Sequence, residues 1–256
     1  MNVVVCVKQI PDPANPGALD PSTNFLKRDG KLILDESDAY GVEMALQLAD
    51  KAGGGEVTLV SMAPNNETSG LRTALAMGAA KAILISDDTL AGSDALGTAK
   101  VLAAAIKRVE GADLVIAATE ASDGYTGTVP EQIAALLDIP SITFAKHIEV
   151  ADGKAKVQRQ TEAGFDEVES DLPTLVTVTA GVVEPRYPSF KGIMAAKGKP
   201  VEELKVADLE GLGDLAVTQE ITDVAAAEER KAGEKVVDEG DAHEKIVAFL
   251  DQLKVI

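Results

Sequence analysis

The chain is poor in the residues that build metal centres and covalent cross-links. Its 256 residues include one cysteine, two histidines and no tryptophan, and only 3% are aromatic. The single cysteine, Cys6, excludes an intrachain disulfide and any cluster held by four cysteines of this chain. Because Cys6 lies in an apolar run at 3–7, we expect a small buried hydrophobe there and no metal site.

The chain also lacks a surplus of positive charge and any long apolar run. Its formal net charge of −18 disfavours nucleic acid and acidic membrane surfaces as partners, so no nucleic acid is expected to bind. No stretch approaches the roughly 20 apolar residues that a membrane helix needs. The start, MNVVVCVKQIPD, enters an apolar strand without a preceding basic region, which predicts no signal peptide and a cytoplasmic location.

Apolar runs and helical patterns alternate up to about residue 145. This alternation predicts an α/β fold with a mainly parallel, doubly wound sheet and helices on both faces. The strand segments are continuously apolar, as burial on both faces requires. The expected strands lie at 3–7, 57–62, 82–85 and 114–118, and the expected helices at 38–52, 68–79, 95–109 and 128–137.

The pattern changes after residue 145. Antiparallel strands are expected at 146–150, 154–160 and 168–169, with a hairpin turn at Asp152-Gly153, and a further strand at 175–179. From residue 201 the apolar periodicity is weak and acids are frequent, which indicates an arm that is mobile or lies on a partner. A short amphipathic helix is expected at 244–253. The predicted domains are therefore an α/β domain at 1–200 and a C-terminal arm at 201–256.

A small, glycine- and threonine-rich turn follows the strand at 114–118. It reads TEASDGYTGTVP over 119–130 and leads into a helix. Backbone N–H groups at such a helix start favour a phosphate, and Gly124 and Gly127 permit its close approach. The alternative is an ordinary strand–helix turn capped by Thr128. Lys8 is either a candidate cation for the phosphate or a solvated surface lysine.

No catalytic motif stands out in the sequence. The chain has no G-x-S-x-G, no H-E-x-x-H and no cysteine–histidine pairing, so a cofactor would perform any chemistry. The glycine turn is neither a Walker loop nor a GxGxxG fingerprint. A stand-alone adenine-nucleotide-binding or hydrolysing α/β protein remains an alternative, with Asp123 as its one tempting phosphate-cleaving residue.

Two prolines frame a segment that carries large apolar side chains. Residues 182–200 read VVEPRYPSFKGIMAAKGKP. Pro185 and Pro188 predict an ordered loop rather than a helix or strand. Phe190 and Met194 either contact another molecule from this loop or pack into the core.

Several of these segments together resemble the beta subunits of electron transfer flavoproteins, over nearly the whole chain. The matching segments are VVVCVKQIPD at the start, LRTALAMGA at 71–79, ASDG at 121–124, VQRQTEAGFDEVESDLPTLVTV at 157–178, EPRYPSFKGIMAAKGKP at 184–200 and the acidic AGEKVVDEG at 232–240.

The resemblance implies an electron carrier and not an enzyme. Such a chain pairs with an alpha subunit, which holds most of the FAD, while the beta subunit holds a structural AMP. The C-terminal arm would pack on the alpha subunit. The heterodimer would carry electrons from flavin dehydrogenases, such as the acyl-CoA dehydrogenases of fatty acid oxidation, to a membrane quinone oxidoreductase.

The resemblance also implies site residues. The AMP site would comprise Cys6, Asp35, Glu36, Ser37, Asp38, Met62, Ala118, Thr119, Asp123, Gly124, Thr126, Gly127, Thr128 and Val129. Residues 183–199, here called the docking segment, resemble the loop that contacts dehydrogenases. Its docking residues would be Arg186, Tyr187, Phe190, Ile193 and Met194.

The chain departs from relatives at a few of these positions. Phe190 replaces an anchoring leucine, and Ala195 and Gly198 stand where some relatives carry lysines. Flavin-bifurcating relatives, which bind a second FAD in the beta subunit and take hydride from NADH, typically read DGDTAQVGP in the glycine turn. This chain reads DGYTGTVPE, with Glu120 and Tyr125 also unusual, which favours AMP.

Overall fold

The computed structural model describes residues 1–15, 17–225, 233 and 235–256. It divides into two compact units, Met1–Ile221 and Thr222–Ile256, which are described separately. Part of the acidic segment at 232–240, namely residues 232 and 234, lies outside the described residues, as do residues 226–231 of the expected arm.

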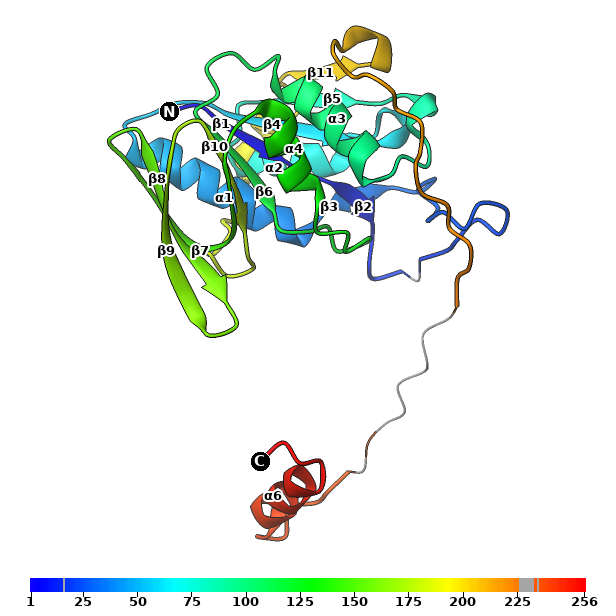
Figure 1. The fold of residues 1–256 in the computed structure, drawn as a ribbon, viewed down its shortest axis with the longest axis vertical. Helices are drawn as coiled ribbons and strands as arrows, with labels where there is room; N and C mark the ends of the chain where they lie inside the picture. Colours follow the sequence, from blue (N-terminus) through cyan, green and yellow to red (C-terminus); the bar gives the residue numbers. More distant parts are fainter. Residues whose placement is uncertain (16, 226–232, 234) are drawn as a thin grey trace. The chain divides into compact units, whose positions relative to one another are not determined.

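The first unit is built on a large sheet (Figure 1). Its nine strands have the order β11-β5-β4-β1-β6-β10-β7-β8-β9 within the described residues, and β2 and β3 form a separate antiparallel pair. Strands β11 to β7 run parallel, whereas β7, β8 and β9 pair antiparallel. The strands are β1 (Val3–Cys6), β2 (Gln9–Pro11), β3 (Leu32–Leu34), β4 (Val57–Met62), β5 (Lys81–Ile85), β6 (Leu114–Ala118), β7 (Ser141–Ala151), β8 (Lys154–Thr161), β9 (Gly164–Asp171), β10 (Thr174–Val178) and β11 (Val201–Leu204).

Helices cover both faces of this sheet. Residues of α1, α2 and α5 join one core cluster, and residues of α3 and α4 join the other. The arrangement confirms the predicted α/β class. The α-helices of this unit are α1 (Glu36–Lys51), α2 (Ser69–Met77), α3 (Ala95–Ile106), α4 (Val129–Leu137) and α5 (Phe190–Ala196), with 3₁₀ turns at Pro64–Asn66, Asp88–Leu90 and Val206–Asp208.

Strand β1 shows why the parallel strands are continuously apolar. Val3 and Val5 join the core beneath α1 and α2, whereas Val4 and Cys6 join the core beneath α3 and α4. All four residues are therefore buried. Truncating a fully buried leucine in such a core, for example Leu71 or Leu75, costs about 2–5 kcal/mol of stability.

The chain reverses direction across the sheet beside β1. From β1 it passes through α1 to β4 and β5 on one side, and then returns through α3 to β6 on the other side. Because α1, which comes after β1, and α4, which comes after β6, cover opposite faces, the loops that follow β1 and β6 separate at the carboxyl edge of the sheet. Such a switch point is where open α/β sheets bind their ligands.

Two segments differ from the sequence-based expectation. The docking segment is not wholly a loop, because α5 begins at Phe190, directly after Ser189, whose side chain accepts a hydrogen bond from the N–H of Gly192. Pro188 therefore restricts the backbone only before the start of α5. The prediction that the whole docking segment is a loop was wrong.

The second difference concerns the predicted boundary at residue 200. Val201–Leu204 form β11, which pairs in parallel with β5 at the edge of the main sheet. Leu204 and Leu209 are buried in the core, and the first unit extends to Ile221. An edge strand reading VEEL presents two exposed acids between its apolar ends, so its sequence carries little strand signal.

The second unit contains the expected amphipathic helix, α6 (Ala242–Gln252). Its apolar side chains Ile246, Val247 and Phe249 are more than half exposed, at 56%, 54% and 58%. In the part of the chain that the structure describes, no helix has the length and apolar character needed to cross a bilayer.

Candidate functional site

Three neighbouring strands bring the predicted site residues to one edge of the sheet. Cys6, Met62 and Ala118 end β1, β4 and β6, and these strands lie side by side in the order β4-β1-β6. The stretch Asp35–Asp38 opens α1, and Val129 opens α4. Sequence positions more than 100 residues apart therefore meet at the switch point.

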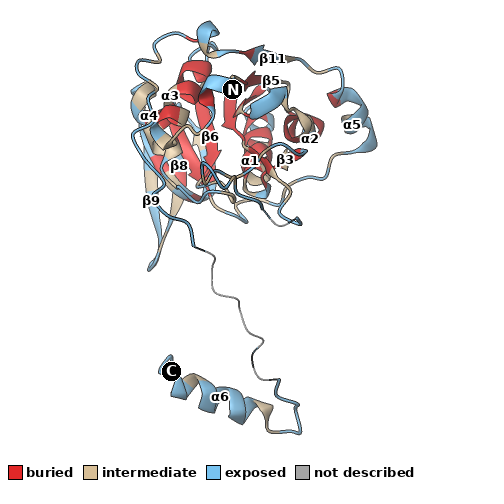
Figure 2. Cartoon of the chain, turned by 90° about the vertical axis from the view of Figure 1, so that its right-hand side faces the viewer, coloured by how far each residue is buried: buried red, intermediate tan, exposed pale blue. Residues whose placement is uncertain are grey.

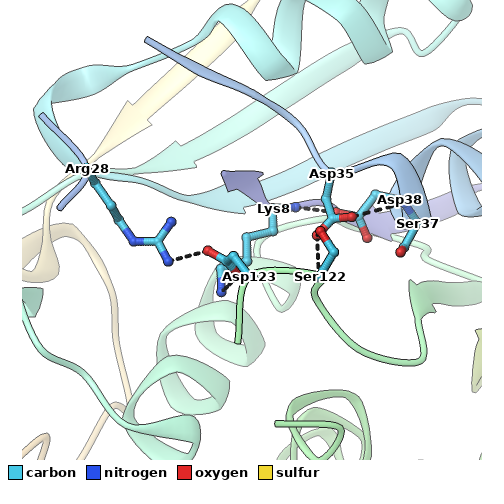
Figure 3. Close-up of polar contacts among 7 residues, drawn as sticks. All are labelled: Lys8, Arg28, Asp35, Ser37, Asp38, Ser122 and Asp123. Carbon is cyan, nitrogen blue, oxygen red and sulfur yellow. Dashed lines mark hydrogen bonds and ion pairs between the residues drawn. The ribbon is translucent and has the colours of Figure 1, made fainter. Parts of the chain in front are cut away.

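Asp35 ties the start of α1 to the 118–129 loop (Figure 3). Its Oδ1 caps α1 by accepting a hydrogen bond from the N–H of Ser37 at 3.0 Å. Its Oδ2 accepts bonds from the N–H and hydroxyl of Ser122, at 2.7 and 3.0 Å. Asp35 is completely buried, so this one carboxylate fixes two separate segments against each other.

Asp123 gathers two cations at the same loop. Lys8 Nζ donates a hydrogen bond to Asp123 at 2.7 Å, and Arg28 forms a second ion pair with the other carboxylate oxygen. The Asp123 side chain is only 7% exposed. Burial raises the pKa of Asp123, but the hydrogen bonds and charges of Lys8 and Arg28 outweigh this effect and hold the pKa below its ordinary value.

Asp38 is a third carboxyl group at this edge. Its Oδ2 accepts a hydrogen bond from the N–H of Lys8 at 2.6 Å, and its side chain is buried. Burial raises the pKa of Asp38 well above its ordinary value, the neighbouring charge of Asp35 adds to the rise, and the Lys8 N–H opposes it. The nearby Cys6 thiol has a pKa raised to about 12 by burial and by Asp38, so it stays protonated at neutral pH.

The raised pKa of Asp38 predicts a pH-dependent effect of Asp38→Asn. A carboxyl group with a raised pKa in the folded state contributes a cost that is absent below its unfolded pKa of about 3.9 and grows as the pH rises towards the folded pKa. Asparagine keeps an acceptor for the Lys8 N–H but carries no charge. Urea unfolding should therefore show the variant gaining stability relative to the parent between pH 4 and 8, and a difference independent of pH would contradict this account.

The last part of the 118–129 loop presents free backbone donors. Among the described residues, no protein acceptor receives a hydrogen bond from the N–H groups of Thr126, Gly127, Thr128 or Val129. Thr128 precedes α4 but makes no side-chain cap, and Gly127 takes a positive φ of 64°. Consecutive free N–H groups at a helix start are the donor set that a phosphate needs.

The remaining predicted residues line the same edge without polar contacts of comparable strength. Thr119 donates to the carbonyl of Val178 at 3.1 Å, whereas Glu36 is exposed. The nearest heavy atoms to a side chain built on Gly124 would be Thr126 Oγ1 and Lys8 Nζ, at 3.8 and 3.9 Å. The cation Lys8 thus lies beside the loop but is already paired with Asp123.

Sequence reasoning missed Arg28 and Ser122. Arg28 lies 95 residues from Asp123 in sequence, and Ser122 lies 87 residues from Asp35. Neither pairing leaves a local pattern. Ser122 stands within the ASDG turn, so the turn pointed to the right segment but not to this side chain.

The docking segment presents its apolar residues outward. Tyr187 and Phe190 are 94% and 80% exposed, and Ile193 and Met194 about half, at 48% and 50%. The alternative in which Phe190 and Met194 pack into the core is therefore wrong. Arg186 differs from the other predicted docking residues, because its guanidinium is bound to Glu43 of α1 at 2.6 and 3.0 Å.

The fold and the loop define a doubly wound α/β protein with a run of free backbone N–H groups at its switch point. The chain matches the family model of the electron transfer flavoprotein domain over residues 23–209. It is 38% identical to the electron transfer flavoprotein subunit beta of Mycobacterium leprae over 264 residues. The aligned region covers 100% of this chain and 99% of that protein. The chain belongs to the electron transfer flavoprotein family, on the beta-subunit side.

Other relatives are similar over most of their length. The electron transfer flavoprotein subunit beta of Megasphaera elsdenii is 39% identical over 214 residues, covering 81% of this chain and 79% of that protein. The caffeyl-CoA reductase-Etf complex subunit CarD of Acetobacterium woodii is 42% identical over 202 residues, covering 78% and 77%. Beta subunits of this family are electron carriers and pair with an alpha subunit.

Proposed function

We propose that this chain is the beta subunit of an electron transfer flavoprotein that carries electrons from flavin dehydrogenases to a membrane quinone oxidoreductase. In this account a bound AMP has a structural role in the beta subunit, and the alpha subunit holds most of the FAD, which supplies the redox chemistry. The observation that carries the proposal is the set of free N–H groups at 126–129, at the switch point of a chain that belongs to this family.

The geometry supports a monophosphate bound by the backbone. The cations Lys8 and Arg28 are engaged by Asp123, and Asp35 and Asp38 bring further carboxyl groups to the edge. The loop is therefore rich in main-chain donors and poor in free positive charge. A run of N–H groups at 126–129 suits one phosphate group, whereas the pyrophosphate of a dinucleotide places two phosphate groups against the protein.

A second candidate is a flavin-bifurcating protein with a second FAD in this subunit. It is favoured by the 42% identity to CarD, a subunit of a caffeyl-CoA reductase-Etf complex. The sequence DGYTGTVPE in the loop favours AMP instead. Hydrolysis by a stand-alone protein gains no support, because the nearly buried Asp123 is committed to two cations.

The subunit assignment predicts a difference in colour between preparations. If the alpha subunit holds the redox-active flavin, this chain expressed alone should be colourless, and the co-expressed pair should be yellow with a bleachable flavin spectrum. Absorbance between 350 and 500 nm before and after dithionite measures this. A lone chain purified with a stoichiometric, reducible flavin would contradict the assignment.

A further inference from the structure

The docking segment is attached to the rest of the unit at both of its ends. In Figure 2, α5 lies beside α2, with α5 largely exposed and α2 largely buried. The approach is close at Gly192, where an added Cβ would stand 2.5 Å from the carbonyl oxygen of Ala76. Any side chain at position 192 would therefore push α5 away from α2.

Two cations join α5 and α2 reciprocally. Arg72 of α2 donates two hydrogen bonds of 2.8 Å, to the carbonyls of Ala196 and Lys199 at the end of α5. Lys199 in turn donates to the carbonyls of Leu75 and Ala79 at the end of α2, at 2.8 and 2.6 Å. The last carbonyls of a helix lack partners within it, and positive charge is favourable there. Each helix end is thus completed by a cation from the other segment.

The other end of the docking segment is held by Glu43. This α1 side chain is only 4% exposed and accepts two bonds from the Arg186 guanidinium, at 2.6 and 3.0 Å, and one from the Arg186 backbone N–H at 3.3 Å. Gln47 donates a further bond to Glu43 at 2.8 Å. A bidentate pair fixes direction as well as distance.

We propose that Glu43, Arg72 and Lys199 are positioning residues that hold the docking segment in its partner-binding shape. None of the three carries the exposed apolar surface of Tyr187 and Phe190. An ordered segment loses less conformational entropy when a partner binds, so the holding contacts strengthen docking without touching the partner. The inference rests on the proposed docking role of this segment, and the partner expected is a flavin dehydrogenase with an apolar pocket.

The test compares Arg72→Met and Glu43→Gln in the co-expressed heterodimer. Steady-state reduction by an acyl-CoA dehydrogenase should show a KM for the heterodimer raised about ten-fold, with kcat within about two-fold of the parent. Amide hydrogen exchange should accelerate at 187–196 while the strands of the main sheet keep their protection. Arg72→Lys, which retains one cationic donor, should have a KM between that of Arg72→Met and that of the parent.

Arg108→Met is the matched control. Arg108 also joins a helix end to a distant carbonyl, with bonds of 3.2 Å to Asp208 and 3.0 Å to Glu202, but it holds the segment around β11. Its KM should stay at the parent value. If Arg72→Met does not assemble with the alpha subunit, Arg72→Lys is measured in its place. A raised KM and faster amide exchange at 187–196 in Arg72→Lys would then support the positioning role, and parent-like values would overturn it.

Parallel measurement of Phe190→Ala separates failure of this inference from failure of the docking role. An effect of Phe190→Ala with parent-like KM in the Arg72 and Glu43 variants would overturn the positioning role alone. No effect of Phe190→Ala would overturn the docking role as well. A fall in kcat with unchanged KM, or faster exchange throughout the main sheet, would also overturn the inference, because those results indicate general destabilisation.

Discussion

Replacing Phe190 with alanine is expected to slow reduction of the heterodimer by a flavin dehydrogenase by about 30-fold, which corresponds to about 2 kcal/mol. Phe190 is 80% exposed, so its removal takes little from the core of the subunit. A large exposed aromatic at the start of a short, anchored helix suits the centre of a small interface, where few residues carry most of the binding energy. Stopped-flow reduction at several heterodimer concentrations gives the second-order rate constant.

The control for this prediction is Phe165→Ala. Phe165 is also well exposed, at 61%, but lies on β9 in the antiparallel part of the sheet. We expect this variant to react within about two-fold of the parent rate. Both variants should keep the flavin content and melting temperature of the parent. A parent-like rate for Phe190→Ala would remove the docking role from this side chain.

Replacing Asp35 with alanine is expected to lower the free energy of unfolding by about 3 kcal/mol and to release the AMP that we propose this subunit binds. The buried carboxylate accepts three hydrogen bonds, from Ser37 and from both donors of Ser122. Its loss leaves α1 without a cap and leaves the 118–129 loop without its tie to α1. Urea unfolding measures the stability, and chromatography of the denatured protein measures the nucleotide.

Asp94 provides a close control. It caps α3 through the N–H of Gly97 at 2.8 Å and ties a distant segment through the N–H and hydroxyl of Thr218, at 2.9 and 2.8 Å. It therefore makes the same three kinds of bond as Asp35, but at the start of α3, which follows β5, rather than at the start of α1. Asp94→Ala should lose stability and keep its nucleotide. Equal nucleotide loss in the two variants would show that general destabilisation, rather than the Asp35 tie, empties the site.

The sequence predicted the parallel part of the fold well, because each strand and helix there carries its own signal. Continuous apolar runs gave β1, β4, β5 and β6, and helix-period patterns gave α1 to α4. The fold class is confirmed. The sequence failed at β11, whose acids face solvent, and at α5, whose seven residues follow a proline that ordinarily ends regular structure.

The sequence predicted where in the fold the candidate site lies, but not which side chains contact each other there. Carboxyl ends of parallel strands share one edge, so Cys6, Met62 and Ala118 had to lie near one another once the topology was right. The ion pair of Arg28 with Asp123 and the pairing of Arg186 with Glu43 join segments 95 and 143 residues apart. Arg186 is predicted to contact a partner, and no pattern in the sequence indicated that its guanidinium also binds Glu43 of its own subunit. The binding roles of the site residues stay predictions.

Identification of the nucleotides in the purified heterodimer tests the central claim most directly. The co-expressed pair is denatured, the released nucleotides are separated by chromatography, and each is counted per heterodimer. The account predicts one AMP and one FAD. Two FAD and no AMP would contradict it, and would assign the cradle at 126–129 to a second flavin.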